Sequence, residues 1–280
     1  SERAMTDPMP EPVARWDFQR RLPGRPNASG DITRLFNTGD SRPPRSFSRL
    51  LNRSEESSIS AAIYGREGIA NCVDASLARS DRAEMFSLEA EFRALTGQQS
   101  IDYWDLLDLS NLAGRAGDRS VSRKDLGLGA KDCLSEGREK PLRLLTVRER
   151  FGGGMPGGLD DPRSVLVRAL LNVGEAQEMA GAAGSYGFGK AAVAQASRIR
   201  VVLAYTCAPA FDGDPVTRRL LGVTYWGMHD LGSERYTGWA LYGRQDNNET
   251  ATFEDDKADQ LALQLGLDIR DPEEPSDQGT

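Results

Sequence analysis

Residues 65–76 read Gly65-Arg-Glu67-Gly-Ile-Ala-Asn71-Cys-Val-Asp74-Ala-Ser76. The spacing i, i+4, i+7 brings Glu67, Asn71 and Asp74 onto one face of an α-helix. Glu67 is suited to act as a general base, and the Asn71 side-chain oxygen is a ligand type that Mg²⁺ prefers. An ordinary amphipathic helix with a polar outer face would show the same pattern. The predicted helix spans residues 56–79, and an apolar stripe lies beside the polar row: Ile59, Ala62, Ile63, Ile69, Ala70 and Val73.

Two later stretches are rich in glycine. Residues 142–155 read as an apolar strand that ends in Phe151-Gly152-Gly-Gly154-Met155, and residues 184–190 read Gly-Ser-Tyr-Gly-Phe-Gly-Lys. Backbone N–H groups of a glycine loop that enters a helix can bind phosphates. The second stretch is also close to a P-loop, but Ala191 follows where that motif needs Ser or Thr. A plain flexible loop is the alternative for these glycines.

The order of the three stretches resembles that of the GHKL, or Bergerat-fold, ATPases, which include gyrase B, MutL, sensor histidine kinases and the MORC ATPases. The first motif of that superfamily is Glu-x-x-x-Asn-x-x-Asp-Ala, and Glu67, Asn71, Asp74 and Ala75 match every position. The resemblance covers residues 55–205. Residues 221–243 are similar to a bacterial MORC-like branch that is associated with restriction and anti-phage defence.

The resemblance implies a Mg²⁺-dependent ATPase with slow turnover, in which ATP closes a lid and brings two subunits together as a homodimer. Glu67 would orient and deprotonate the attacking water, Asn71 would bind Mg²⁺, and Asp74 would support the nucleotide or the water shell of the metal. Most of the catalysis would come from positioning and charge neutralisation. The residues that would close over the phosphates are Gly184, Ser185, Gly187, Gly189 and Lys190.

The middle motif departs from the superfamily pattern, which is Asp-x-Gly-x-Gly with the Asp accepting a hydrogen bond from the adenine amino group. Counting back from Gly152 and Gly154 puts Arg150 in the Asp position, and arginine is only a donor. The alternation of the preceding strand instead favours Glu149, with one residue inserted. Glu149 and Arg150 as a surface pair is the alternative, and it would fit an interaction module whose nucleotide site is degenerate and which has no ATPase activity.

Composition limits the other classes of function. The chain has 280 residues and a formal net charge of −7, so broad contact with a DNA backbone is disfavoured and would fall to other regions or to local basic patches. The three cysteines are far apart and form no CxxC pair, which argues against zinc and fits a reducing cytoplasm. No apolar run is long enough for a membrane span. We therefore expect a cytoplasmic protein whose partners are ATP, a second subunit and proteins of a defence system.

We divide the chain into a Pro- and Arg-rich N-terminal arm, residues 1–55, and an ATP-binding domain, residues 56–280. The arm either crosses to a partner subunit or is a loose tail. The domain is expected to be truncated at its C-terminal end, because Gly279-Thr280 resembles the Gly-Thr that opens a strand in the superfamily. The predicted fold class is α+β: a two-layer α/β sandwich of the GHKL type, with a mixed sheet covered by helices on one face.

The pattern of the chain predicts the remaining elements. His229, the only histidine, is expected to be structural. A hairpin is expected around residues 230–233. Strands are predicted at residues 85–92, 142–147, 199–205, 220–226 and 239–242, and helices at residues 101–112, 161–179, 191–196 and 256–265.

Overall fold

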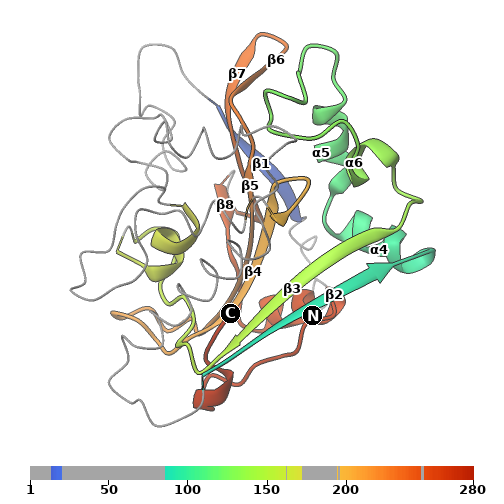
Figure 1. The fold of residues 1–280 in the computed structure, drawn as a ribbon. Helices are drawn as coiled ribbons and strands as arrows, with labels where there is room; N and C mark the ends of the chain where they lie inside the picture. The colour runs from blue at the N-terminus through green and yellow to red at the C-terminus, as the bar shows by residue number, and fades with distance from the viewer. Residues whose placement is uncertain (1–13, 21–85, 162, 172–193, 195, 247–248) are drawn as a thin grey trace, which may run out of the picture.

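The computed structural model describes residues 14–20, 86–161, 163–171, 194, 196–246 and 249–280. Within them lies one large sheet, in the order β1-β7-β5-β4, and a separate two-stranded ribbon, β2-β3 (Figure 1). The main strands are β1 (Ala14–Arg20), β4 (Val201–Cys207), β5 (Arg218–Tyr225) and β7 (Glu234–Asp246). The ribbon is β2 (Ser87–Leu95) with β3 (Leu142–Arg150), and short strands β6 (His229–Leu231), β8 (Glu249–Ala251) and β9 (Phe253–Glu254) extend the large sheet.

All strand pairings among the described residues are antiparallel. The α+β class is therefore confirmed, but the predicted mixed sheet differs from the sheet that the structure describes. From β4 to β7 the strands follow one another through short returns, which suit antiparallel neighbours because parallel neighbours need long crossover connections. The predicted hairpin is one such return: Leu231 pairs with Glu234 across Gly232, whose φ is +61°.

The strands of the large sheet bury side chains on both faces. On β5, Leu220 belongs to one core and Leu221 to another, as alternation along a strand requires. The first core also holds residues of α4 (Gln98–Leu106), α5 (Leu109–Ala116) and α8 (Asp256–Gln264). The second is covered by residues 164–171, which include the π-helical turn η1 (Val167–Leu171). Helical cover thus lies on both faces rather than on one (Figure 1). Two small elements complete the described part, α6 (Cys133–Glu136) and η2 (Pro275–Asp277).

The strands predicted at residues 85–92, 142–147, 199–205 and 220–226 and the helix at 256–265 are confirmed with small shifts at their ends, and residues 239–242 are part of the longer β7. The helix predicted at residues 161–179 begins only at residue 165, and residues 14–20, which lie within the predicted N-terminal arm, form β1 of the large sheet.

The helix predicted at residues 101–112 is two helices. Asp108 adopts a left-handed conformation with φ of +46° and separates α4 from α5. The Leu107 carbonyl accepts a hydrogen bond from the Trp16 indole N–H at 2.7 Å, and the Leu106 carbonyl accepts one from the Tyr242 hydroxyl. Side chains of the sheet therefore donate hydrogen bonds to two carbonyls that, in a continuous helix, would accept from backbone N–H groups of the next turn.

His229 lies in a buried aromatic cluster at the β6–β7 end of the sheet. Its ring stacks on Tyr236 at 5.7 Å between centroids, and the Arg115 guanidinium lies over the rings of Phe18 and Tyr236 at 3.9 and 4.2 Å. His229 Nδ1 is 3.0 Å from the Gly227 carbonyl oxygen, and Nε2 is 3.2 Å from Arg115 Nη1. Since arginine can only donate, Nε2 accepts and Nδ1–H donates, which requires a neutral ring. Burial lowers the pKa of His229, and the Arg115 charge lowers it further.

We expect the free energy of unfolding to fall as the pH is lowered from 7 to about 5. The unfolded chain takes up a proton near the ordinary histidine pKa of about 6.5, whereas the folded ring stays neutral until its lower pKa is reached. The stabilisation is thus complete above that ordinary value and is lost as the pH falls toward the folded one. The matched control is His229→Gln, because a glutamine amide donates and accepts without titrating. Urea unfolding across this pH range measures the effect, and a wild type that depends on pH no more than His229→Gln contradicts it.

Candidate functional site

The end of β3 presents a buried carboxylate to a glycine loop. Glu149 is 9% exposed although it is the penultimate residue of its strand. A Cβ added to Gly152 would lie 1.2 Å from Glu149 Oε1. The Glu149 side chain therefore lies directly against the backbone of Gly152, and any larger residue at position 152 would displace it.

The backbone of the glycine loop has positive φ angles, which residues with a side chain rarely adopt. Phe151, Gly153 and Gly154 have φ of +60°, +84° and +64°. A Cβ on Gly154 would come within 2.2 Å of the Cys207 carbonyl oxygen at the end of β4. The loop is therefore held close to β4, and the Met155 N–H donates to Thr206 Oγ1 at 2.7 Å.

Residues 278–280 lie between the ends of β3 and β4. The Glu149 N–H donates to the Thr280 carbonyl at 2.7 Å, and the Gly153 N–H donates to the Gln278 carbonyl at 3.1 Å. On the other side, Gly279 and Cys207 exchange two backbone hydrogen bonds of 2.9 Å in an antiparallel bridge. This segment ties the ribbon and its glycine loop to the large sheet.

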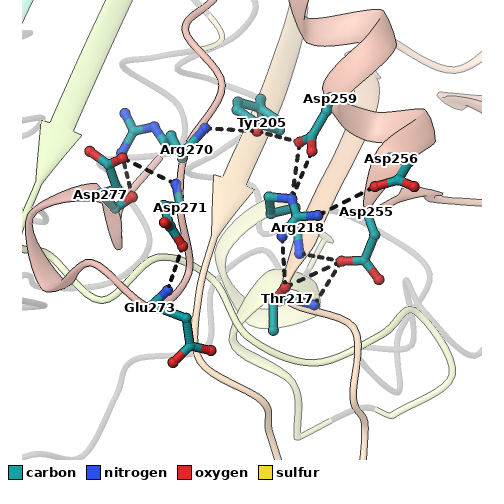
Figure 2. Close-up of polar contacts among 10 residues, drawn as sticks. All are labelled: Tyr205, Thr217, Arg218, Asp255, Asp256, Asp259, Arg270, Asp271, Glu273 and Asp277. Atoms are coloured by element: carbon teal, nitrogen blue, oxygen red, sulfur yellow. Dashed lines mark hydrogen bonds and ion pairs between the residues drawn. The ribbon is translucent and has the colours of Figure 1, made fainter.

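The buried side chain of Arg270 donates hydrogen bonds at the junction where residues 278–280 meet the end of β3. It is 6% exposed, and its Nη1 donates to the carbonyls of Glu149 at 2.7 Å and Asp277 at 3.1 Å. Its Nη2 donates to the Thr280 carbonyl at 3.2 Å. Burial lowers the pKa of Arg270, and the nearby Arg150 charge lowers it further. Figure 2 shows Arg270 beside Asp277.

A second polar network attaches α8 to β4 and β5 next to this junction (Figure 2). Asp259 accepts hydrogen bonds from the Tyr205 hydroxyl at 2.6 Å and from Arg218 Nε at 2.9 Å. Asp255 accepts from the backbone N–H groups of Thr217 and Arg218 at 3.2 and 3.1 Å. Burial raises the pKa of Tyr205, and its hydrogen bond to Asp259 raises it further. These contacts fix the sheet on which the loop rests.

The structure gives Glu149 and Arg150 different environments. The Glu149 side chain is buried against Gly152, whereas Arg150 forms an ion pair with Asp277 and keeps 39% of its side chain exposed. Glu149, Gly152 and Gly154 are brought together at the start of the loop. The other predicted site residues lie outside the described residues: Glu67, Asn71, Asp74, Gly184, Ser185, Gly187, Gly189 and Lys190.

Sequence reasoning missed the residues that support the loop, Arg270 and Thr206 among them. No local pattern marks them, since their partners are 121 and 51 residues away. Three aspartates outside this junction are paired with arginines: Asp161 and Asp212 with Arg163, and Asp214 with Arg219. Among the described residues, no group of three or more acidic, histidine or cysteine side chains is arranged to hold a metal ion.

Comparisons with known proteins give no match: no family model, curated protein or solved structure is similar to this chain. None of the helices in the described ranges has the length and apolar character needed to cross a membrane.

Proposed function

We propose that the chain is an ATPase of the GHKL type, which binds ATP with Mg²⁺ and hydrolyses it slowly. Binding would close the lid and bring two subunits together, as a switch in DNA-directed anti-phage defence. The observation that carries the proposal is the Glu149 carboxylate, which is buried against Gly152 at the start of the glycine loop. An ionised carboxylate only accepts hydrogen bonds, so this position fits the amino group of adenine.

In this proposal the residues of the described site would contact the base end of the nucleotide. Glu149 supplies the acceptor, and the Arg270 bond to its carbonyl holds its backbone in place. Gly152 leaves room for the carboxylate, since a side chain there would occupy the same space. When bound, Mg²⁺ would neutralise phosphate charge. The proposed roles of Asn71 as metal ligand, Glu67 as base, Asp74 as support and residues 184–190 as lid rest on the sequence motifs alone.

The alternative is an interaction module on the same scaffold that binds no nucleotide. The close packing of the loop favours it, because Gly152 and Gly154 have structural reasons to be glycine that involve no ligand. The ion pair of Arg150 with Asp277 also stabilises the loop by itself. The ATPase and the interaction module differ in whether Glu149 discriminates between nucleotide bases.

We expect wild-type protein to bind ATP about 10- to 150-fold more tightly than inosine triphosphate, the value of one hydrogen bond to a charged group. Inosine carries an oxygen where adenine has the amino group, so it cannot donate to Glu149. Glu149→Gln should narrow this preference, because an amide also donates to that oxygen. The control is Arg150→Gln, the same replacement on the neighbouring residue, which should keep the preference.

Titration calorimetry with both nucleotides measures these affinities. Equal affinity of wild type for ATP and inosine triphosphate would contradict the role of Glu149. Loss of the preference for ATP in Arg150→Gln but not in Glu149→Gln would show that Glu149 does not contact the base.

A further inference from the structure

At its β2 edge, the ribbon formed by β2 and β3 pairs with no other described strand. Within the described part of the chain, β2 pairs with β3 alone, through nine residue pairs from Ser87–Arg150 to Leu95–Leu142. The ribbon runs obliquely from the lower end of the large sheet toward α4 (Figure 1). An edge strand of this length presents unpaired backbone groups to any other strand that approaches it.

The two faces of the ribbon differ in character. Ala90 lies opposite Val147 and Phe92 opposite Leu145, so these apolar side chains share one face. Phe92 is 81% exposed, more than the other exposed large apolar residues, Leu263 and Ile269. The apolar face is therefore exposed along β2 at Ala90, Phe92 and Ala94, whereas Glu149, at one end of the same face, is buried.

The charged face of the ribbon points toward the end of α8. Arg93 Nη2 donates to the Leu265 carbonyl at 3.1 Å, and Arg148 pairs with Glu91 at 2.9 Å. The Glu91 and Arg93 side chains still keep 36% and 25% of their surface exposed. Glu91 and Arg93 also pair with each other at 4.0 Å within β2, so a second strand at this edge would share charges that already have partners.

The sequence of β2 is complementary to itself. In an antiparallel pair centred on Phe92, each Glu91 lies opposite Arg93 of the other copy, and each Ala90 lies opposite Ala94. Opposite charges and aromatic side chains in facing positions each stabilise such pairs. The small alanines on either side leave room for the two phenylalanine rings. A twofold axis makes the same patch serve both copies.

We propose that β2 is a self-association edge, through which two copies of this chain pair antiparallel about Phe92 and form a four-stranded sheet. The occupant is a second copy because the strand supplies both partners of each charged pair. This association uses neither the N-terminal arm nor the glycine loops, so it does not require ATP and differs from the nucleotide-driven association proposed above.

The first test is analytical ultracentrifugation of the full chain without nucleotide. We expect dimers in the wild type, and Phe92→Lys should weaken dimerisation at least about tenfold, because it removes a central aromatic contact and places like charges on the axis. The control is Leu263→Lys, which makes the same replacement at an exposed leucine on α8 and should dimerise as the wild type does. Wild-type protein that stays monomeric at roughly 100 μM, where weak complexes form, would overturn the proposal, as would equal loss in both variants.

The second test fixes the register by cross-linking under mild oxidation. Phe92→Cys chains should form disulfide-linked dimers, because facing residues in an antiparallel pair have Cα atoms about 4.5–5.5 Å apart. Ala90→Cys chains should not link to each other, since that offset is about 13 Å along the strand, but they should link when mixed with Ala94→Cys chains. Wild type is the control for the native cysteines. Cross-linking of Ala90→Cys alone to the same extent as Phe92→Cys would overturn the proposed pairing.

Discussion

Replacing Glu67 with alanine is expected to slow phosphate release from ATP by about 10²- to 10⁴-fold, the usual cost of losing a general base. ATP affinity should change little, because the carboxylate would contact the attacking water rather than the phosphates. Removal of a negative charge near the triphosphate would, if anything, strengthen binding. The prediction is motivated by the match of Glu67, Asn71 and Asp74 to the first motif of the superfamily.

Asn71→Ala is the matched comparison, since it changes a residue on the same predicted helix face. It removes a Mg²⁺ ligand, so both Mg²⁺-ATP affinity and turnover should fall. Calorimetry and steady-state phosphate release on both variants separate the two roles. Wild-type turnover in Glu67→Ala would refute the assigned base, and equal loss of ATP binding in both variants would make Glu67 a structural residue.

Arg270→Ala is expected to lower the free energy of unfolding by about 2–6 kcal/mol, because two buried carbonyls, those of Glu149 and Asp277, lose the guanidinium donor and each such loss costs about 1–3 kcal/mol. The Thr280 carbonyl loses the Arg270 bond but keeps the Glu149 N–H as its donor. ATP affinity should fall as well, because the Glu149 backbone loses its support. Chemical unfolding and calorimetry measure the two effects.

Two controls make the Arg270 prediction specific. Arg270→Lys keeps the charge but has a single nitrogen in place of the planar guanidinium, so it should recover part of the stability. Arg235→Ala removes an exposed arginine that pairs with Asp230 at the surface, and its effect should stay within about 1 kcal/mol. A loss for Arg270→Ala no larger than that for Arg235→Ala would contradict the structural role of Arg270.

Strands β4 and β5, the middle of β7 and α8 could be predicted from the sequence because their signal is local. Residues 220–226 and 199–205 are apolar and β-branched, and α8 is followed by Gly266 with φ of +72°, a typical helix end. β1 was not predicted, because its partner β7 lies near the other end of the chain. The break at Asp108 could not be predicted in this way. It depends on Trp16 and Tyr242, whose partners are 91 and 136 residues away in the chain.

In the candidate site too, residues with a local sequence pattern could be predicted, whereas residues whose partners are distant in the chain could not. The glycine pattern located the loop at residues 152–154, and strand alternation favoured Glu149 over Arg150 as the inward residue, which agrees with its burial. The partner of Arg150 is Asp277, 127 residues away, so no local pattern could indicate that ion pair. Arg270 was missed for the same reason.

The central claim, that the chain binds Mg²⁺-ATP, is tested most directly by isothermal titration of the wild-type protein with ATP in the presence and absence of Mg²⁺, with ADP as the comparison. The proposed function predicts saturable binding of one ATP per chain, tighter with Mg²⁺ than without. Folded protein, verified by circular dichroism, that releases no binding heat with ATP and leaves ATP unretained in equilibrium dialysis would contradict it.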